Sequence, residues 1–365
     1  MKEQKTQTTR YVGIDLGKRT YEMAIVGKQG KVTFTNGKTT IEGRQMLYKK
    51  LCSKDKVALE AGNLAFIMAK EIEAIVGCQV YVLNPYQLVI IYKSMKKTDK
   101  EDSLKLAHIL EDTREERLPT VAVPSDEEMR RRKLLASYRR EQQSRTRALN
   151  RLHSLFLAQG ITTIRKKNLD TVASRKKAII ILTGLELEEA EHLLLSLELY
   201  EQRIEVLDQR MTEAAKGDEQ IERLQTVPGV GPKVSFAFVS HVAAERFENA
   251  AQVSNYLGMV PRVYISGDTK RYGKITKRGN SYIRALLVQA AWSLTRTKAG
   301  GKLKERYIYM TKEKGISKKK AIVAIARRIG ELMYAMMRDG TKYEPRPFIR
   351  DKEYGCNLAR LALSA

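Results

Sequence analysis

Alternating apolar and polar positions in the first third of the chain predict a sheet of short strands. Near the N-terminus the alternation is interrupted by Gly17 and Gly30, which predicts an antiparallel meander of three strands. Two further apolar runs alternate with segments of helical period, which indicates an α/β sheet with parallel members. The predicted strands are Tyr11 to Leu16, Tyr21 to Val26, Lys31 to Thr35, Lys56 to Glu60 and Gln79 to Leu83. The predicted helices are Ile41 to Leu51, Leu64 to Val76 and Lys97 to Glu111.

The middle of the chain has the pattern of two long helices. Pro119 and Pro124 mark a boundary, and Ser125 is a good cap for a helix that starts directly after it. Apolar residues then recur at spacings of three and four in two separate stretches, which a basic segment, residues 164 to 177, connects. The pattern favours an antiparallel coiled-coil hairpin or a dimerisation arm, with ordinary bundle packing as the alternative.

The last third is predicted to be mainly helical. Residues 228 to 232, PGVGP, form a tight turn between two helices, where Gly229 and Gly231 let phosphate oxygens approach backbone N–H groups beside Lys233. This resembles a helix-hairpin-helix, and a purely structural turn is the alternative. Residues 261 to 280 lack a helical period and are expected to form a loop or small hairpin before a helix from Ser281 to Leu294.

The length of 365 residues exceeds what one core normally holds. We therefore predict an α/β catalytic domain over residues 1–120 and coiled-coil or linker helices over 121–217. A mainly helical domain over 218–345 and a poorly ordered tail over 346–365 complete the division.

The chain carries a strong and uneven positive charge. Lys and Arg number 67 against 42 Asp and Glu, a net charge of +25. Residues 261–320 hold 17 basic and three acidic residues, whereas residues 185–224 hold 12 acids and four bases. Tyrosines interleave the basic stretch, which favours nucleic acid as the partner. The first fifteen residues lack an apolar leader and no apolar run reaches membrane-spanning length, so we expect a cytoplasmic, nucleoid-associated protein with no membrane partner. Three scattered cysteines and four histidines argue against disulfides and zinc.

Four carboxylates stand where such a sheet can gather them. Asp15 lies within the first strand and Glu60 ends the fourth, while Asp99 and Asp102 share one face of the helix that follows. If the first and fourth strands are adjacent, these side chains converge. Hard oxygen ligands of this kind suit Mg²⁺, and two Mg²⁺ ions would activate a nucleophile and stabilise a leaving oxygen at a phosphodiester. The alternative is that each acid is simply solvated or caps a helix.

Ser266 lies in the basic segment of the last third, followed by Gly267. Its hydroxyl could attack a phosphorus atom whose developing charge neighbouring cations stabilise. No histidine neighbours it, and a serine before glycine is most often an ordinary turn residue. The cations expected to contact nucleic acid there are Arg262, Lys270, Arg271, Lys274, Lys277 and Arg278.

The spacing of these motifs resembles two known groups. The predicted strand order and the four acids resemble the ribonuclease H-like fold of RuvC-type Holliday-junction resolvases, which are usually about half this length. The whole chain from residue 10 to 340 resembles the DEDD transposases of the insertion-sequence family numbered one hundred and ten, to which the Piv invertase is related. The motifs are GIDLGK, LEAGN, KKTDKEDSLKLA, PGVGP and the block from YLGMVPR to SYIRALL.

The family resemblance implies specific chemistry and partners. Asp15, Glu60, Asp99 and Asp102 would be the metal-binding tetrad, and Ser266 the nucleophile that forms a covalent phosphoserine link to DNA. The partners would be donor and target double-stranded DNA, a noncoding guide RNA called the bridge RNA, and further copies of the chain in a homodimer or homotetramer. Two other functions stay open: a metal-dependent junction endonuclease without a covalent intermediate, and a non-catalytic nucleic-acid-binding scaffold.

One departure from the family pattern affects the serine loop. Family members often have Ser-Gly-Gly-Lys, where this chain has Ser266-Gly267-Asp268-Thr269-Lys270. The loop is thus one residue longer and carries an acid. Ser281 is the alternative nucleophile, but its position predicts that it caps the following helix.

Overall fold

The computed structural model describes the chain except residues 1–8, 28–29, 63, 92–97, 267–268 and 346–365. The chain divides into two compact units, residues 1–125 and 126–365. Three predicted features lie outside the described residues: the tail over 346–365, the loop residues Gly267 and Asp268, and the helix start at Lys97. The division into three domains and a tail stays a prediction.

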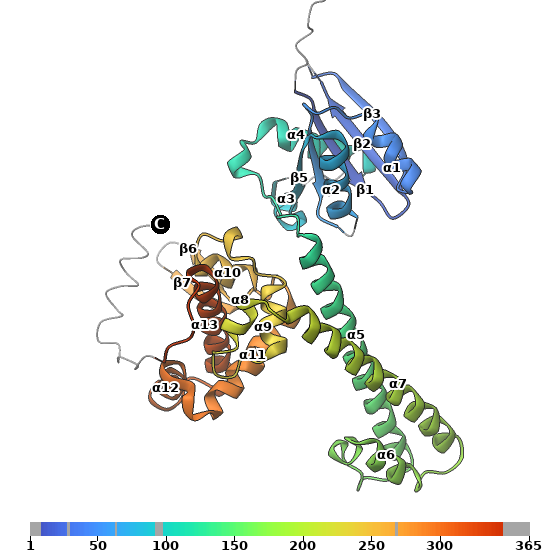
Figure 1. The fold of residues 1–365 in the computed structure, drawn as a ribbon, viewed down its shortest axis with the longest axis vertical. Coiled ribbons are helices and arrows are strands. Elements are labelled where there is room, and N and C mark those ends of the chain that lie inside the picture. The colour runs from blue at the N-terminus through green and yellow to red at the C-terminus, as the bar shows by residue number, and fades with distance from the viewer. Residues whose placement is uncertain (1–8, 28–29, 63, 92–97, 267–268, 346–365) are drawn as a thin grey trace, which may run out of the picture. The chain divides into compact units, whose positions relative to one another are not determined.

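The first unit is built on a five-stranded mixed sheet with the order β3-β2-β1-β4-β5 (Figure 1). The meander pairs antiparallel, and β1, β4 and β5 run parallel, as predicted; β1 and β4 are neighbours, which is the condition under which the ends carrying Asp15 and Glu60 converge. The strand β3 extends to Lys38, three residues beyond the prediction, because each of its residues pairs with β2. The strands are β1 (Tyr11–Leu16), β2 (Thr20–Val26), β3 (Val32–Lys38), β4 (Lys56–Glu60) and β5 (Gln79–Leu83).

Helices cover both faces of this sheet. One face packs Val12, Ile14 and Leu59 against the helices α1 and α2, and the other packs Ala58 and Leu83 against α4. A short helix after Asn84 was not predicted; proline at its first position is compatible with a helix start. The helices are α1 (Ile41–Tyr48), α2 (Ala65–Val76), α3 (Pro85–Ile91), α4 (Asp99–Asp112) and the 3₁₀ turn Glu115–Arg117.

Gly13 lets α4 lie directly on β1. A Cβ atom at residue 13 would stand 1.9 Å from the carbonyl oxygen of Ser103 and 2.5 Å from the backbone nitrogen of Ala107. Both of those atoms belong to the backbone of a helix and cannot turn aside. Gly13 therefore fixes how closely the helix that begins at Asp99 approaches the strand that carries Asp15.

We expect Gly13→Ala to lower the free energy of unfolding by about 3 kcal/mol or more, the upper end of overpacking costs, because a whole helix must move. Thermal or urea unfolding measures the loss. Gly27→Ala is the matched control, since its added Cβ would meet only the carbonyl oxygen of Lys31 at 3.7 Å. Equal stability of the two variants would contradict this account of the packing.

The second unit begins with an antiparallel helical pair. The helices α5 (Asp126–Ala158) and α7 (Gly184–Ala215) lie side by side (Figure 1). Tyr138 in the first half of α5 and Met211 near the end of α7 belong to one apolar cluster, and Leu152 near the end of α5 and Leu194 in the first half of α7 belong to another, so the two helices run antiparallel. The predicted helical hairpin is therefore present. Its role as a coiled-coil dimerisation arm stays a prediction.

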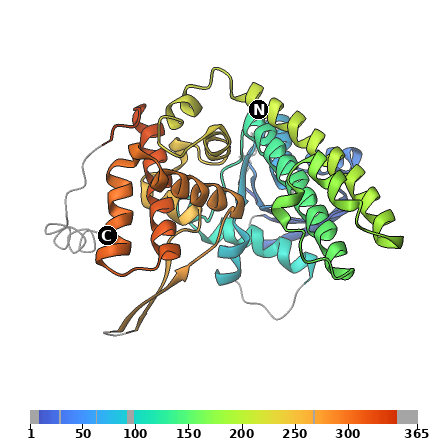
Figure 2. The ribbon, with the colours of Figure 1, turned by 90° about the horizontal axis from the view of Figure 1, so that it is seen from below.

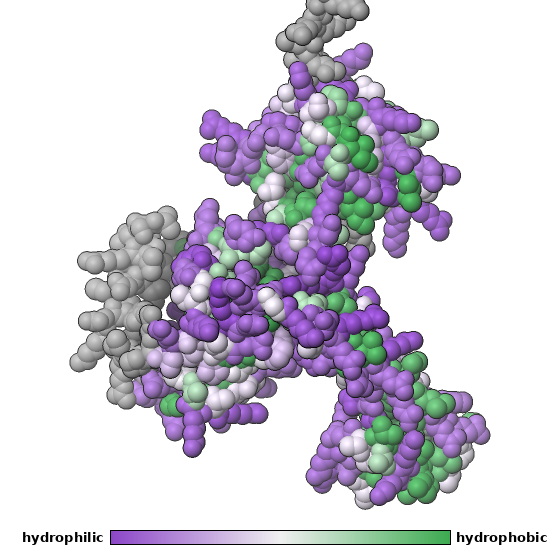
Figure 3. Space-filling view, in the orientation of Figure 1, coloured by the Kyte–Doolittle hydropathy of each residue, from purple (hydrophilic) through white to green (hydrophobic). Residues whose placement is uncertain are grey.

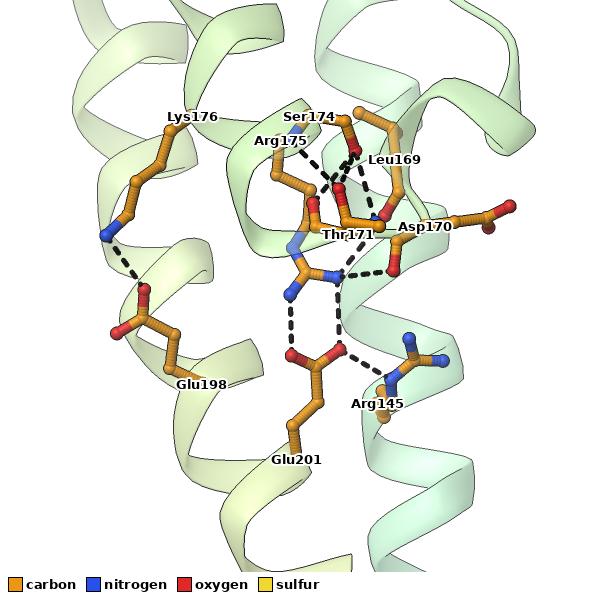
Figure 4. Close-up of polar contacts among 9 residues, drawn as sticks. All are labelled: Arg145, Leu169, Asp170, Thr171, Ser174, Arg175, Lys176, Glu198 and Glu201. Atoms are coloured by element: carbon orange, nitrogen blue, oxygen red, sulfur yellow. Dashed lines mark hydrogen bonds and ion pairs between the residues drawn. The ribbon is translucent and has the colours of Figure 1, made fainter.

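The end of the helical pair at which a connecting segment joins α5 to α7 contains a buried arginine. The connection contains the 3₁₀ turn Lys166–Leu169 and α6 (Val172–Ile179), and Arg175 on α6 is 1% exposed. Its guanidinium donates to both carboxylate oxygens of Glu201 at 2.6 and 3.0 Å, and Arg145 donates to the same carboxylate at 2.8 Å (Figure 4). This network joins α5, α6 and α7. Apolar patches are visible on the surface at this end of the pair (Figure 3). Ile180 and Leu185, which follow α6 in the chain, are exposed.

Up to residue 345, the described rest of the second unit is helical apart from one two-stranded ribbon and the connecting loops. The long helix α13 is the centre of its core, packing on α10 and α11. The strands β6 (Pro261–Ser266) and β7 (Thr269–Ile275) extend from the helices as the predicted hairpin (Figure 2). The helices are α8 (Glu219–Leu224), α9 (Pro232–Val239), α10 (Ala250–Tyr256), α11 (Ser281–Arg296), α12 (Gly301–Ile308), α13 (Lys318–Asp339), the 3₁₀ turns Ala244–Arg246 and Lys298–Gly300, and the π-helical turn Tyr309–Glu313.

The start of α11 differs from the prediction. The prediction that Ser281 caps α11 is wrong: Asn280 is the cap, because its side chain accepts the hydrogen bond of the Tyr282 backbone N–H, and Ser281 is the first helical residue.

Within the described residues, none of the helices combines the length and apolar character needed to cross a bilayer.

Candidate active site and nucleic-acid surface

The carboxyl ends of β1 and β4 place two of the four predicted acids on the face of the sheet that α4 covers. Asp15 shares this face with Gly13, two residues before it, and Glu60 shares it with Ala58. The third and fourth acids come from α4, whose first turn contains Asp99 and Asp102 and is capped by Thr98. Acids in a first helical turn are favoured by the unpaired N–H groups there.

The negative charges of the other three predicted acids act on Asp15. The pKa of Asp15 is raised, first because the side chain is half-buried and then because Asp99, Asp102 and Glu60 repel its negative charge. A hydrogen bond from the backbone N–H of Leu16 opposes this rise in pKa only in part. Like charges gathered at such a cost to stability are typical of functional sites.

A cavity of about 530 Å³ opens at this point of the sheet, and Asp15 and Glu60 both line it together with Lys18 and Thr39. Asp102 forms an ion pair with Lys105 at 2.8 Å. In the described part of the chain, no three His, Cys, Asp or Glu side chains are arranged to hold one metal ion as they stand. The donor chemistry nevertheless fits a hard divalent cation, because all four candidate ligands are carboxylates.

A fifth acid near this site, Glu22, was not predicted from the sequence. Glu22 on β2 pairs in register with Asp15, so the two side chains share one face of the sheet. Glu22 is only 9% exposed, and its Oε1 atom has no hydrogen-bond partner in the structure. The alternation of the strand YEMAIV places an acid at an inward position, which could have marked Glu22 as a candidate. Its position opposite Asp15 could not be predicted, because the register depends on the turn between the two strands.

Ser266 is exposed at the end of β6 in the second unit, where it pairs with Thr269 on β7. Both faces of this ribbon are open, and Tyr264 and Tyr272 are 60% and 69% exposed. The side chain of Lys270 lies outside the described part of the chain. The other predicted cations of this segment are all exposed: Arg262, Arg271, Lys274, Lys277 and Arg278.

The PGVGP turn connects α8 and α9, and its two glycines differ in their surroundings. Gly229 has a φ of +87°, and a Cβ there would stand 2.4 Å from the carbonyl oxygen of Ala290, so this glycine is required for packing on α11. Gly231 caps α9 and has open space around it. Lys233 pairs with Asp208 at 3.0 Å and donates to the Tyr138 hydroxyl at 2.6 Å.

Two family models match the chain. Residues 12–159 match the DEDD model described as "Transposase", and residues 221–307 match the model described as "Transposase IS116/IS110/IS902 family". The chain belongs to the IS110 family of DEDD transposases. The first match spans Asp15, Glu60, Asp99 and Asp102, and the second spans Ser266 and the PGVGP turn.

Related transposases are similar to this chain over most of their length. A protein of Pseudomonas aeruginosa named "Probable family 20 transposase" is 27% identical over 92% of this chain and 98% of its own length. The transposase of the element IS1328 from Yersinia enterocolitica is 26% identical over 77% and 82%, and that of IS1111A from Coxiella burnetii is 23% identical over 90% and 89%.

Membership of the IS110 family gives the chain a general activity. It is the transposase of an insertion sequence, and thus an enzyme that binds, cleaves and rejoins DNA. The DEDD domain indicates dependence on a divalent metal.

Proposed function

We propose that this transposase is a DNA recombinase guided by a noncoding bridge RNA, and that it works through a phosphoserine intermediate. In this proposal the first unit is a ribonuclease H-like, RuvC-like domain that holds Mg²⁺ ions on Asp15, Glu60, Asp99 and Asp102. The second unit supplies Ser266 as the nucleophile. The observation that carries the proposal is that Asp15 and Glu60, at the ends of the adjacent strands β1 and β4, line one cavity, while Asp99 and Asp102 lie in the first turn of α4, the helix on the same face of the sheet. The charges of Glu60, Asp99 and Asp102 raise the pKa of Asp15, in agreement with this arrangement.

The sheet order supports the ribonuclease H-like assignment. An antiparallel meander followed by parallel strands, with β1 in the centre and an acid at its end, is what the sequence resemblance leads us to expect. The helix pair and the PGVGP turn between α8 and α9 are the candidate coiled coil and helix-hairpin-helix. For the helix-hairpin-helix, Gly231 is the glycine open enough for a phosphate to approach.

The chemistry of the proposal balances without a cofactor that stores energy. The Ser266 Oγ atom forms a bond to phosphorus as the bond between that phosphorus and a deoxyribose oxygen breaks. The serine proton passes to a base, and the leaving oxygen takes up a proton to become a free hydroxyl. Attack by the hydroxyl of another strand then breaks the serine ester and restores the serine. The bound cations would stabilise the negative charge that develops on the phosphate oxygens.

Each group of residues in the chain has a defined task in this scheme. The four acids hold the cations in place, and the exposed arginines and lysines of β6 and β7 bind the phosphates that flank the reacting one. In the proposed homodimer or homotetramer, the acids of one subunit act on the same strand as the serine of another.

The guide-RNA part of the proposal has its own support and test. A net charge of +25 suits a protein that contacts backbones while base pairing selects the sequence. We expect the purified chain to carry one discrete RNA species transcribed from its element. A donor and target DNA pair matching that RNA should recombine, and a pair with a scrambled match should not. Sequencing of co-purified RNA followed by a recombination assay measures both, and the recovery of only heterogeneous RNA would contradict guidance.

A further inference from the structure

A second cavity, lined by basic side chains, lies in the second unit. Its residues have no part in the proposed chemistry. It has a volume of about 340 Å³. One wall is the α5 segment from Arg132 to Gln143, and the other is formed by His241 and the start of α11. The lining side chains that could meet an anion are Arg132, Arg139, Arg140, Gln143, Asn280 and Tyr282.

Two arginines of this cavity differ from most others on α5. Arg130, Arg131, Arg145 and Arg151 each form an ion pair with a carboxylate. Arg139 instead donates to the Ser281 hydroxyl at 3.0 Å and lies over the Tyr282 ring, and Arg140 donates only to the Ser137 hydroxyl at 2.9 Å. Among the described residues, no acidic side chain forms an ion pair with either. Their positive charges are therefore available to a ligand.

The opposite wall of the cavity is uncharged, and hydrogen bonds connect its side chains. The His241 Nδ1–H donates to the carbonyl oxygen of Ala237 at 3.1 Å, and its Nε2 accepts from the amide of Asn280 at 3.1 Å. The Asn280 side-chain oxygen accepts in turn from the backbone N–H of Tyr282. Burial, together with the nearby Arg132, lowers the pKa of His241 to about 4, so this imidazole stays neutral at physiological pH.

We infer that this cavity binds a phosphodiester group of a nucleic-acid backbone, through Arg139 and Arg140. Guanidinium groups match the geometry of phosphate oxygens, and a cavity already formed by fixed side chains needs little reorganisation on binding. Two further exposed cations, Lys277 and Arg278, lie just before Asn280 in the chain. The inference deepens the proposed function, because it rests on the chain handling nucleic acid and names one contact.

The test uses two variants of the full chain and one matched control. Arg140→Gln removes one cavity charge, and Ala136→Glu places an acid at an exposed helical position that lines the cavity. Arg147→Gln is the control, because Arg147 is also exposed on α5 and donates to a serine three residues earlier, Ser144, at 3.1 Å, but does not line the cavity.

Binding is measured by fluorescence anisotropy at several salt concentrations, with a labelled DNA duplex and a single-stranded RNA of equal length. Arg140→Gln should weaken binding several-fold at low salt and lower the salt slope by about 1, and Ala136→Glu should weaken binding by about 10-fold or more. Arg147→Gln should change affinity less than about twofold. A loss confined to one probe identifies the nucleic acid that fills the cavity.

Two outcomes would overturn the inference. In the first, both cavity variants keep their affinity for both probes to within about twofold, as Arg147→Gln is expected to do. In the second, all three variants lose the same amount of affinity, which would mean that only diffuse charge acts. Failure of the proposed function would give another result: the wild-type chain would form no covalent adduct and recombine no DNA. The affinities of the three variants could still be compared, so the cavity would be tested independently.

Discussion

Replacing Asp15 by asparagine is expected to reduce strand cleavage and rejoining by about 10³-fold or more, because a bound cation contributes several kcal/mol of transition-state stabilisation. Asp15 lines the cavity at the ends of β1 and β4, and the charges of the other three acids raise its pKa, so it is the first ligand to test in the proposed metal site. Activity on matched DNA in the presence of Mg²⁺ measures the effect. Asp112→Asn is the control, since it makes the same change at the far end of α4.

Stability separates a lost metal ligand from a misfolded chain. Because the pKa of Asp15 is raised in the folded state, its ionised form disfavours folding, and protonation as pH falls favours it. Asp15→Asn should therefore raise the melting temperature of the metal-free chain at neutral pH. Mg²⁺ should stabilise the wild type more than the variant, and this gain should shrink as the pH falls and Asp15 takes up a proton. A lower melting temperature without metal would contradict the proposed crowding of charge.

Replacing Ser266 by alanine is expected to eliminate the covalent protein–DNA adduct and, with it, all recombination, because no other group would hold the phosphate between cleavage and rejoining. The adduct is detected as labelled DNA that stays with the protein under denaturing conditions. Ser281→Ala is the control serine; its hydroxyl accepts a hydrogen bond from Arg139, which accounts for it structurally.

The three candidate functions give three different results with these variants. A recombinase loses recombination with Asp15→Asn and with Ser266→Ala alike. A junction endonuclease that uses water keeps cleaving DNA after Ser266→Ala. A binding scaffold keeps its affinity for nucleic acid in both variants and cleaves in neither. An adduct that persists in Ser266→Ala but disappears in Ser281→Ala would move the nucleophile to the helix α11.

The local parts of the fold were predictable, and the long-range contacts were not. Alternation located all five strands of the first unit, because the pattern of a strand lies within a few residues. The pairing of Asp15 with Glu22, the packing of Gly229 on α11 and the ion pair of Lys233 with Asp208 each join segments whose register or distance no local pattern encodes.

The candidate site shows the same division. The four acids were identified because spacing and strand ends are local signals. The arginine cavity was not, because it forms only where α5 meets the start of α11, more than a hundred residues away in the chain. Asn280 as the cap of α11 was missed because serine and asparagine are equally good caps, and only the observed hydrogen bond to the Tyr282 N–H decides between them.

The ribbon of β6 and β7 has a consequence for handling the protein. Its outer edges carry backbone groups with no neighbouring strand, and Val263, Tyr264, Ile265 and Tyr272 are exposed on it. Such edges are templates on which identical chains add strand to strand and aggregate. Exposed cations on the same ribbon, such as Arg271 and Lys274, oppose this addition by repulsion, so the chain is expected to aggregate more readily at high salt, where that repulsion is screened.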